Sequence, residues 1–207
     1  MKIFNHRVIE FSRVLEEKPE NVKLKVQETW TPPPSEWIKG NIDAAYKDGV
    51  TALAMVLRDS NSRVVFLATK LDVASSSLEA EMKAFAWALE MAQSMAWHKI
   101  IWSSDAQAMV KEINSNKDPL DWHTRYLTLF CRQILQSKAW ILVWNERGSN
   151  QLADRAAKIT LSKKNNFYFS VDSSLVCSFP SCLRDVTLQD QFANGLLMQA
   201  FWGLFCA

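Results

Sequence analysis

The chain has 207 residues and nearly balanced charge, with 24 Lys and Arg, 22 Asp and Glu, and a formal net charge of +2. Hydrophobic residues make up 48% and charged residues 22%, which is ordinary for a globular domain and too mildly basic to indicate nucleic-acid binding by itself. None of the four cysteines forms a CxxC pair and no His completes a zinc-binding spacing, so a zinc module is not predicted. No signal peptide or membrane-spanning run is present, so reduced thiols and an intracellular location, nuclear or cytoplasmic, are expected.

The first part of the chain predicts an N-terminal extension and a Pro-rich linker over residues 1–31. Apolar residues recur at helical spacing within residues 2–17, and a polar stretch follows them. The string TPPP then predicts a stiff entry into the first strand.

Three strands are predicted next, over residues 37–46, 50–58 and 63–71. The short polar strings KDG and DSNSR separate them, so the three strands should be antiparallel neighbours. An amphipathic helix over about 77–96 should follow, with one of the serines at 75–77 as its N-cap.

The second half of the domain alternates strands and helices. We expect a strand at 98–104, a helix from Asp105, a helix near 121–137, a strand at 139–146 and a helix at about 150–164. Three antiparallel strands followed by βα units predict an α/β fold with a mixed five-stranded sheet and helices on both faces. Residues 166–207 form a C-terminal extension that packs on the domain, mediates association or has no selected role.

Four acidic residues stand within or at the ends of these apolar segments: Asp43, Glu81, Asp105 and Asp154. A carboxylate in such surroundings costs several kcal/mol unless it is paired or binds a metal. Few cationic partners are obvious nearby in the sequence, so the pattern predicts a site for a divalent cation.

Helical geometry separates Glu81 from its neighbour Glu79. At about 100° per residue, Glu81 falls on the apolar stripe of the predicted helix, roughly 40° from Phe85. Glu79 lies well off that stripe. We therefore expect Glu81 to face the sheet and Glu79 to be a solvated neighbour.

The strings WTPPPSEWIKGNIDAAY, VLRDS, LEAEMKAFAWALEMA, IIWSSDAQAMV and ERGSNQLADRAAK resemble the plant ribonuclease H-like domain of non-LTR retrotransposon polyproteins and their stand-alone derivatives. The resemblance assigns residues 32–165 to a ribonuclease H-like domain. It implies a nuclease that hydrolyses the RNA strand of RNA–DNA hybrids with two Mg²⁺ ions, Mn²⁺ being a possible substitute. The resemblance implies that Asp43, Glu81, Asp105 and Asp154 are the catalytic metal ligands and that Asn150 and Arg147 bind substrate.

One departure from the resemblance keeps alternatives open. Trp144 stands where many members of the fold carry a His that assists product release or proton transfer. The alternative is a catalytically weak or inactive nucleic-acid-binding module derived from a retrotransposon. A gene fragment with no selected function is a third interpretation.

Overall fold

The computed structural model describes residues 29–95, 97–119, 121–171 and Leu183. Within these residues the chain forms one six-stranded mixed sheet in the order β5-β4-β1-β2-β3-β6. The strands are β1 (Ile38–Lys47), β2 (Val50–Arg58), β3 (Val64–Val73), β4 (Ile100–Ser104), β5 (Ile141–Trp144) and β6 (Tyr168–Ser170). The predicted three antiparallel strands are confirmed, and β4 and β5 join β1 in parallel on its other side.

The two hairpin turns follow from their residues. Asp48 and Gly49 have φ of 51° and 81°, the positive values that a type I′ two-residue turn requires at both central positions. The turn between β2 and β3 lacks glycine, and Ser62 takes the positive φ there. The Asp59 carboxylate compensates by accepting hydrogen bonds from the Asn61 and Arg63 backbone N–H groups.

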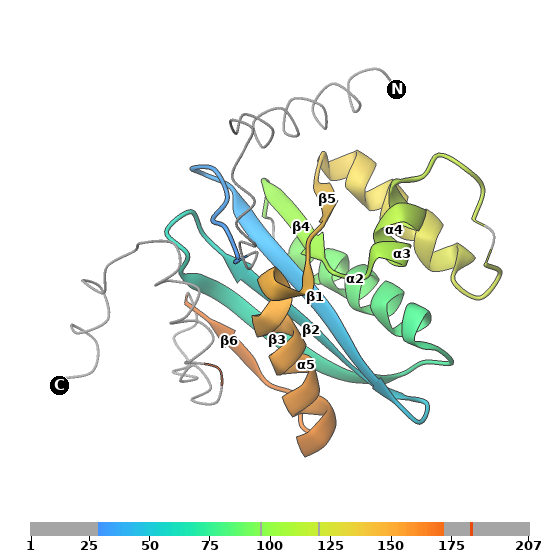
Figure 1. Cartoon of the computed structure of the whole chain (residues 1–207). Coiled ribbons are helices and arrows are strands. Elements are labelled where there is room, and N and C mark those ends of the chain that lie inside the picture. The colour runs from blue at the N-terminus through green and yellow to red at the C-terminus, as the bar shows by residue number, and fades with distance from the viewer. Residues whose placement is uncertain (1–28, 96, 120, 172–182, 184–207) are drawn as a thin grey trace, which may run out of the picture.

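Helices cover both faces of the sheet, as predicted (Figure 1). The helices α2 (Ser77–Ser94), α3 (Gln107–Asn114) and α4 (Arg125–Lys138) pack on one face. The helix α5 (Gln151–Lys163) packs on the other, after the short 3₁₀ helix η1 (Arg147–Asn150). Ser76 is the N-cap of α2, within the predicted range 75–77, and accepts a hydrogen bond from the Glu79 N–H.

The α2–α4 face is packed around large aromatic side chains. The Trp102 ring meets those of Phe85 and Trp140 edge to face, with centroids 5.9 and 6.1 Å away. Gly40 of β1 lies directly under Trp102, so that a Cβ at position 40 would come within 2.5 Å of the ring. Tight packing of this kind gives the sheet one fixed position relative to α2.

The sheet has six strands where five were predicted, because the start of the C-terminal segment adds a strand. Tyr168–Ser170 pairs antiparallel with Phe66, Leu67 and Ala68 of β3. Leu183, further along the same segment, is buried with the α5-side core. The predicted helix at 2–17, Ala96 and the rest of the 172–207 segment lie outside the described residues.

The entry segment also belongs to the packed structure. Trp30, in the stretch expected to be linker, is fully buried. Its ring lies 4.3 Å from the Arg58 guanidinium carbon. In the described part of the chain, no helix has the length and apolar character needed to cross a membrane.

Candidate active site

The site lies where β1 extends beyond the end of its parallel neighbour β4. β4 pairs with β1 only from Ile38 to Asn41 and ends at Ser104, so β1 continues past the end of β4. An open pocket of about 470 Å³ occupies that edge, between α2 and α5. It is lined by Asp43, Ala44, Ala45, Tyr46, Lys47, Ser77, Glu81, Asp105, Ala106, Arg147, Asp154, Lys158 and Leu161.

All four predicted acids line this one pocket, although they come from β1, α2, the β4–α3 connection and α5. Asp43 is buried, with 6% of its surface exposed. Burial raises its pKa well above the ordinary value. The charges of Glu81, Asp105 and Asp154 and a hydrogen bond with Asp105 raise it further.

Glu81 is the second strongly perturbed acid. Burial and the charges of Asp105 and Asp154 raise its pKa to about 8, against a lowering contribution from the Ala44 N–H. Its Oε2 atom is buried and has no hydrogen-bond partner among the described residues. A buried carboxylate oxygen without a hydrogen-bond partner, close to other carboxylates, is costly unless a cation is present.

Asp105 is held by an amide from α5's N-terminus. The Asn150 Nδ2 group donates to Asp105 Oδ1 at 2.9 Å, to Asp43 Oδ1 at 3.2 Å and to the Ile42 carbonyl at 2.9 Å. Asn150 is 1% exposed, so it is buried beside the carboxylates, and its predicted contact with substrate stays a prediction.

Asp154 differs from the other three acids because it has cationic partners. Lys158 Nζ lies 2.7 Å from its carboxylate and Arg147 Nη2 lies 3.5 Å away. Both cations line the pocket. Within residues 29–95, 97–119 and 121–171, no three His, Cys, Asp or Glu side chains already stand in position to hold one ion.

Glu79 has a different role from the expected solvated one. Its Oε2 accepts hydrogen bonds from the Ser75 N–H and hydroxyl, and its Oε1 lies 2.9 Å from Lys83 Nζ. The bonds from Ser75 and the Lys83 charge lower its pKa to about 2. Glu79 therefore caps the start of α2. Glu81, two residues on, meets the sheet at Ala44, as the helical argument predicted, and lines the pocket.

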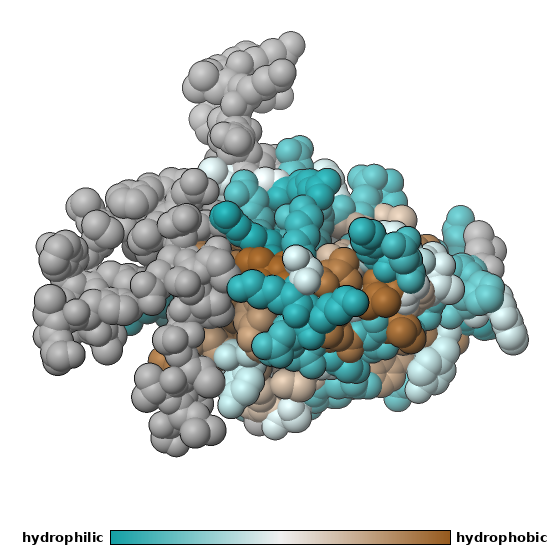
Figure 2. Space-filling model, turned by 90° about the horizontal axis from the view of Figure 1, so that it is seen from below, coloured by the Kyte–Doolittle hydropathy of each residue, from teal (hydrophilic) through white to brown (hydrophobic). Residues whose placement is uncertain are grey.

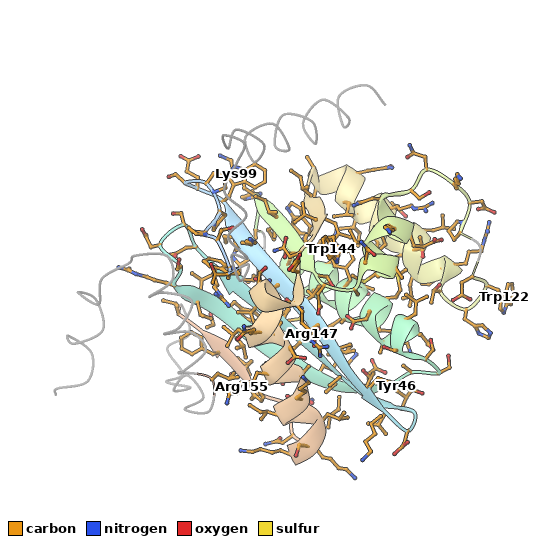
Figure 3. All side chains as sticks on the ribbon, viewed as in Figure 1. Tyr46, Lys99, Trp122, Trp144, Arg147 and Arg155 are labelled. Carbon is orange, nitrogen blue, oxygen red and sulfur yellow. The ribbon has the colours of Figure 1, made fainter. Side chains whose placement is uncertain are left out.

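Trp144 stands beside the site, at the end of β5. The β4–β5 register pairs it with Ser104, and its indole N–H donates to the Asp105 carbonyl at 3.2 Å. It is 43% exposed. Figure 3 shows Trp144 and Arg147 near the start of α5 and Tyr46 toward the far end of β1.

Seen from below, the surface is mostly hydrophilic, with hydrophobic residues visible between the polar ones (Figure 2).

Two buried residues next to the site were missed by the sequence analysis. The amide of Asn41 lies between Trp30 and Asn150, bonded to both. A polar Asn two residues before Asp43 in an otherwise apolar strand was the available signal, since alternation puts positions 41 and 43 on one face. Trp30 gave no such signal, because its position before TPPP suggested a linker.

Comparison with known families and structures identifies the fold and the family. The sequence profile described as "Reverse transcriptase-like" matches residues 41–160, more than half of the chain. The chain belongs to the reverse transcriptase-like family. The match includes all four acids, Asn41 and Asn150 and begins after Trp30. No curated protein matches the sequence.

Solved ribonucleases H share the fold. The RNase H1 of the archaeon Halobacterium salinarum has a TM-score of 0.57 at 22% identity, covering 61% of this chain and 98% of that protein. LC11-RNase H1, isolated from compost by a metagenomic approach, has a TM-score of 0.58 at 14% identity, covering 62% and 98%. The same protein in complex with an RNA/DNA hybrid has a TM-score of 0.56. These likenesses establish a ribonuclease H-like fold for this chain.

Proposed function

We propose that this protein is a Mg²⁺-dependent endonuclease that hydrolyses the RNA strand of RNA–DNA hybrids. The observation that carries the proposal is the convergence of Asp43, Glu81, Asp105 and Asp154 on one pocket. Among the described residues only Asp154 of the four forms an ion pair, and Glu81 Oε2 is buried without a hydrogen-bond partner there. Hybrid binding by a protein of the same fold supports the choice of substrate.

The donor set fits Mg²⁺. Four carboxylates offer hard oxygen ligands, and the open pocket leaves room for the water and phosphate oxygens that complete a Mg²⁺ shell. When bound, two Mg²⁺ ions would activate the attacking water and stabilise the leaving 3′ oxygen. Mn²⁺ offers the same ligand preference and is the natural substitute in assays.

The chain's own groups have distinct roles in this proposal. The four carboxylates hold the cations, and the Asn150 amide keeps Asp43 and Asp105 oriented toward the pocket. Arg147, whose side chain is 75% exposed, can turn from Asp154 to a substrate phosphate. Lys158 can do the same.

The resemblance to retrotransposon domains of plants extends the proposal. We place the chain in the plant ribonuclease H-like family of non-LTR retrotransposons, acting on hybrids in the nucleus or cytoplasm. Residues 32–165 would be the catalytic unit, with Trp30 and β6 packed onto it.

A nucleic-acid-binding module without useful turnover is the second candidate. Two observations favour it: Asp154 is engaged by Lys158 and Arg147, and Trp144 occupies the position expected for a His. In that case the protein would bind a hybrid without cleaving it.

Cleavage of a labelled RNA–DNA hybrid with Mg²⁺ or Mn²⁺ separates the two candidates, with Asp105→Asn alongside and binding measured by fluorescence anisotropy. Cleavage by the wild type and none by the variant supports the nuclease. Binding by folded protein without cleavage identifies the binding module. Absence of both binding and cleavage rejects both candidates.

A further inference from the structure

A line of hydrogen bonds runs from Trp30 through the α5 face of the sheet to the acidic pocket. The Trp30 Nε1–H donates to Asn41 Oδ1 at 2.8 Å, and Asn41 Nδ2 donates to Asn150 Oδ1 at 3.1 Å. Asn150 Nδ2 then donates to Asp105 and Asp43. All three members are buried, with exposures of 0%, 0% and 1%.

The donor at Trp30 and the acceptor carboxylates at the other end determine which way the hydrogen bonds of this line run. An indole N–H can only donate, so Asn41 must turn its carbonyl oxygen toward Trp30. Its NH₂ group then faces Asn150, which must present its own oxygen in return. The NH₂ of Asn150 is thereby fixed toward the carboxylates, which only accept when ionised.

A reversed Asn150 amide would be costly. Its carbonyl oxygen would then face Asp43, Asp105 and the Ile42 carbonyl, three acceptors within 3.2 Å. In a buried setting, such unpaired and repelling oxygens carry a large penalty. The Trp30 donor, the Ser149 carbonyl that also accepts from Asn41 Nδ2 at 3.2 Å, and the acceptors around Asn150 Nδ2 therefore favour the same orientation of the two amides.

We propose that Trp30, Asn41 and Asn150 form a directional hydrogen-bond relay that positions the carboxylates of Asp43 and Asp105 for cation binding. The inference deepens the proposed function and rests on it for the cation. Asn150 acts as a positioning residue and does not contact substrate. The relay also makes Trp30, which precedes the segment matched by the family profile, a working part of the site.

The relay predicts unequal effects from two matched tryptophan changes. Trp30→Phe removes the donor while keeping an aromatic ring against Arg58. Trp102→Phe is the control, because Trp102 is also fully buried and its Nε1–H has no partner among the described residues. Both variants lose the same atoms, but only the first breaks the relay.

Calorimetric titration with Mn²⁺ measures the effect on the site. We expect Asn150→Ala to weaken Mn²⁺ affinity about 10–100-fold, as loss of a group that orients metal ligands does. Trp30→Phe, two bonds further away, should weaken it several-fold, and Trp102→Phe should leave it unchanged. Equal affinities for Trp30→Phe and Trp102→Phe would overturn the proposal.

A second measurement tests the relay without metal or activity. In ¹H–¹⁵N spectra the Trp30 indole resonance is assigned by its loss in Trp30→Phe. We expect Asn150→Ala to shift that resonance and to leave the Trp102 indole in place. If Asn150→Ala does not fold, the Asn150 NH₂ resonances are followed in Trp30→Phe.

The two measurements separate failure of the relay from failure of the nuclease proposal. An unmoved Trp30 resonance in folded Asn150→Ala, or unmoved Asn150 resonances in Trp30→Phe, would show that the three residues are not coupled and would overturn the relay. Coupled resonances with no Mn²⁺ binding by the wild type would overturn the carboxylate-positioning role together with the proposed function, and would leave the three residues a structural chain only.

Discussion

The face of the sheet under α2, α3 and α4 is packed from large apolar side chains, whereas the α5 face packs against the alanines of α5 and carries a line of buried polar groups. Trp102, Phe85 and Trp140 meet edge to face on the first. On the second, α5 contributes alanines, and Asn41 and Asn150 are buried beside them.

This difference separates two tasks. Apolar burial is non-directional and stabilises the fold roughly in proportion to area. Buried amides are tolerated only when their hydrogen bonds are made, and those bonds fix orientation. The first face thus stabilises the sheet, and the second positions Asp43 and Asp105. Substitutions on the α5 face should therefore lower activity, whereas substitutions on the α2–α4 face should lower stability.

Asp43→Asn should have the largest effect. Cleavage should fall by more than about 100-fold, because changes in even the outer partners of metal ligands cost about 10–100-fold. The metal-free protein should become more stable at neutral pH, since burial and three neighbouring acids raise the Asp43 pKa. Hybrid cleavage and urea unfolding measure the two effects, with Asp48→Asn in the exposed β1–β2 turn as control. Cleavage at the wild-type rate would show that the site is wrongly assigned.

Gly40→Ala, on the apolar face, should lower the stability of the protein. The added Cβ would meet the Trp102 ring at 2.5 Å, and such overpacking costs about 1–3 kcal/mol in free energy of unfolding. Gly49→Ala is the control, because its Cβ would meet nothing within 4 Å and would suffer only from its φ of 81°. If Gly40→Ala were no less stable than wild type by urea unfolding, the packing argument for this face would fail.

The pH dependence of stability should distinguish Glu79 from Glu81. Glu79 has its pKa lowered from 4.5 to about 2, so its contribution is present above pH 4.5 and lost as the pH falls toward 2. Glu81 has its pKa raised to about 8, so the folded metal-free protein retains a proton that the unfolded chain has lost. Its effect is a fall in stability as the pH rises from 4.5 to 8.

Unfolding of Glu79→Gln and Glu81→Gln across this range measures both effects. Glu79→Gln should remove the fall in stability below pH 4.5 and leave cleavage nearly unchanged. Glu81→Gln should remove the fall in stability between pH 4.5 and 8 and abolish cleavage. Equal losses of cleavage in the two variants would contradict the assignment of the helix faces.

Trp144→Ala should have the smallest effect. The change removes an N–H donor to the Asp105 carbonyl at a partly exposed position, and one such bond contributes about 0.5–1.5 kcal/mol. Cleavage should therefore fall less than about tenfold. Trp144→His, run in the same steady-state assay, shows whether an imidazole raises turnover. A loss as large as that of Asp43→Asn would make Trp144 a principal part of the site.

The sequence by itself determined the order of elements, the antiparallel β1–β3 unit and the identity of the acids. Alternation, turn residues and helical spacing are local properties, so they can be recognised without the fold. Helical spacing also placed Glu81 on the apolar stripe and Glu79 off it, because position on a helix face is a local property too. Roles in cation binding and catalysis stay predictions.

Only the tertiary structure decided what lies between distant segments. Asn41 and Asn150 are 109 positions apart, and their bond exists because α5 packs across β1. The burial of Trp30, the sixth strand at Tyr168–Ser170 and the pairing of Asp154 with Lys158 and Arg147 likewise depend on packing or on side-chain conformation. Hydrogen bonds are directional and short-ranged, and ion pairs form only between charges that the fold brings close together. A sequence pattern therefore shows which groups need partners but not which partners the fold supplies.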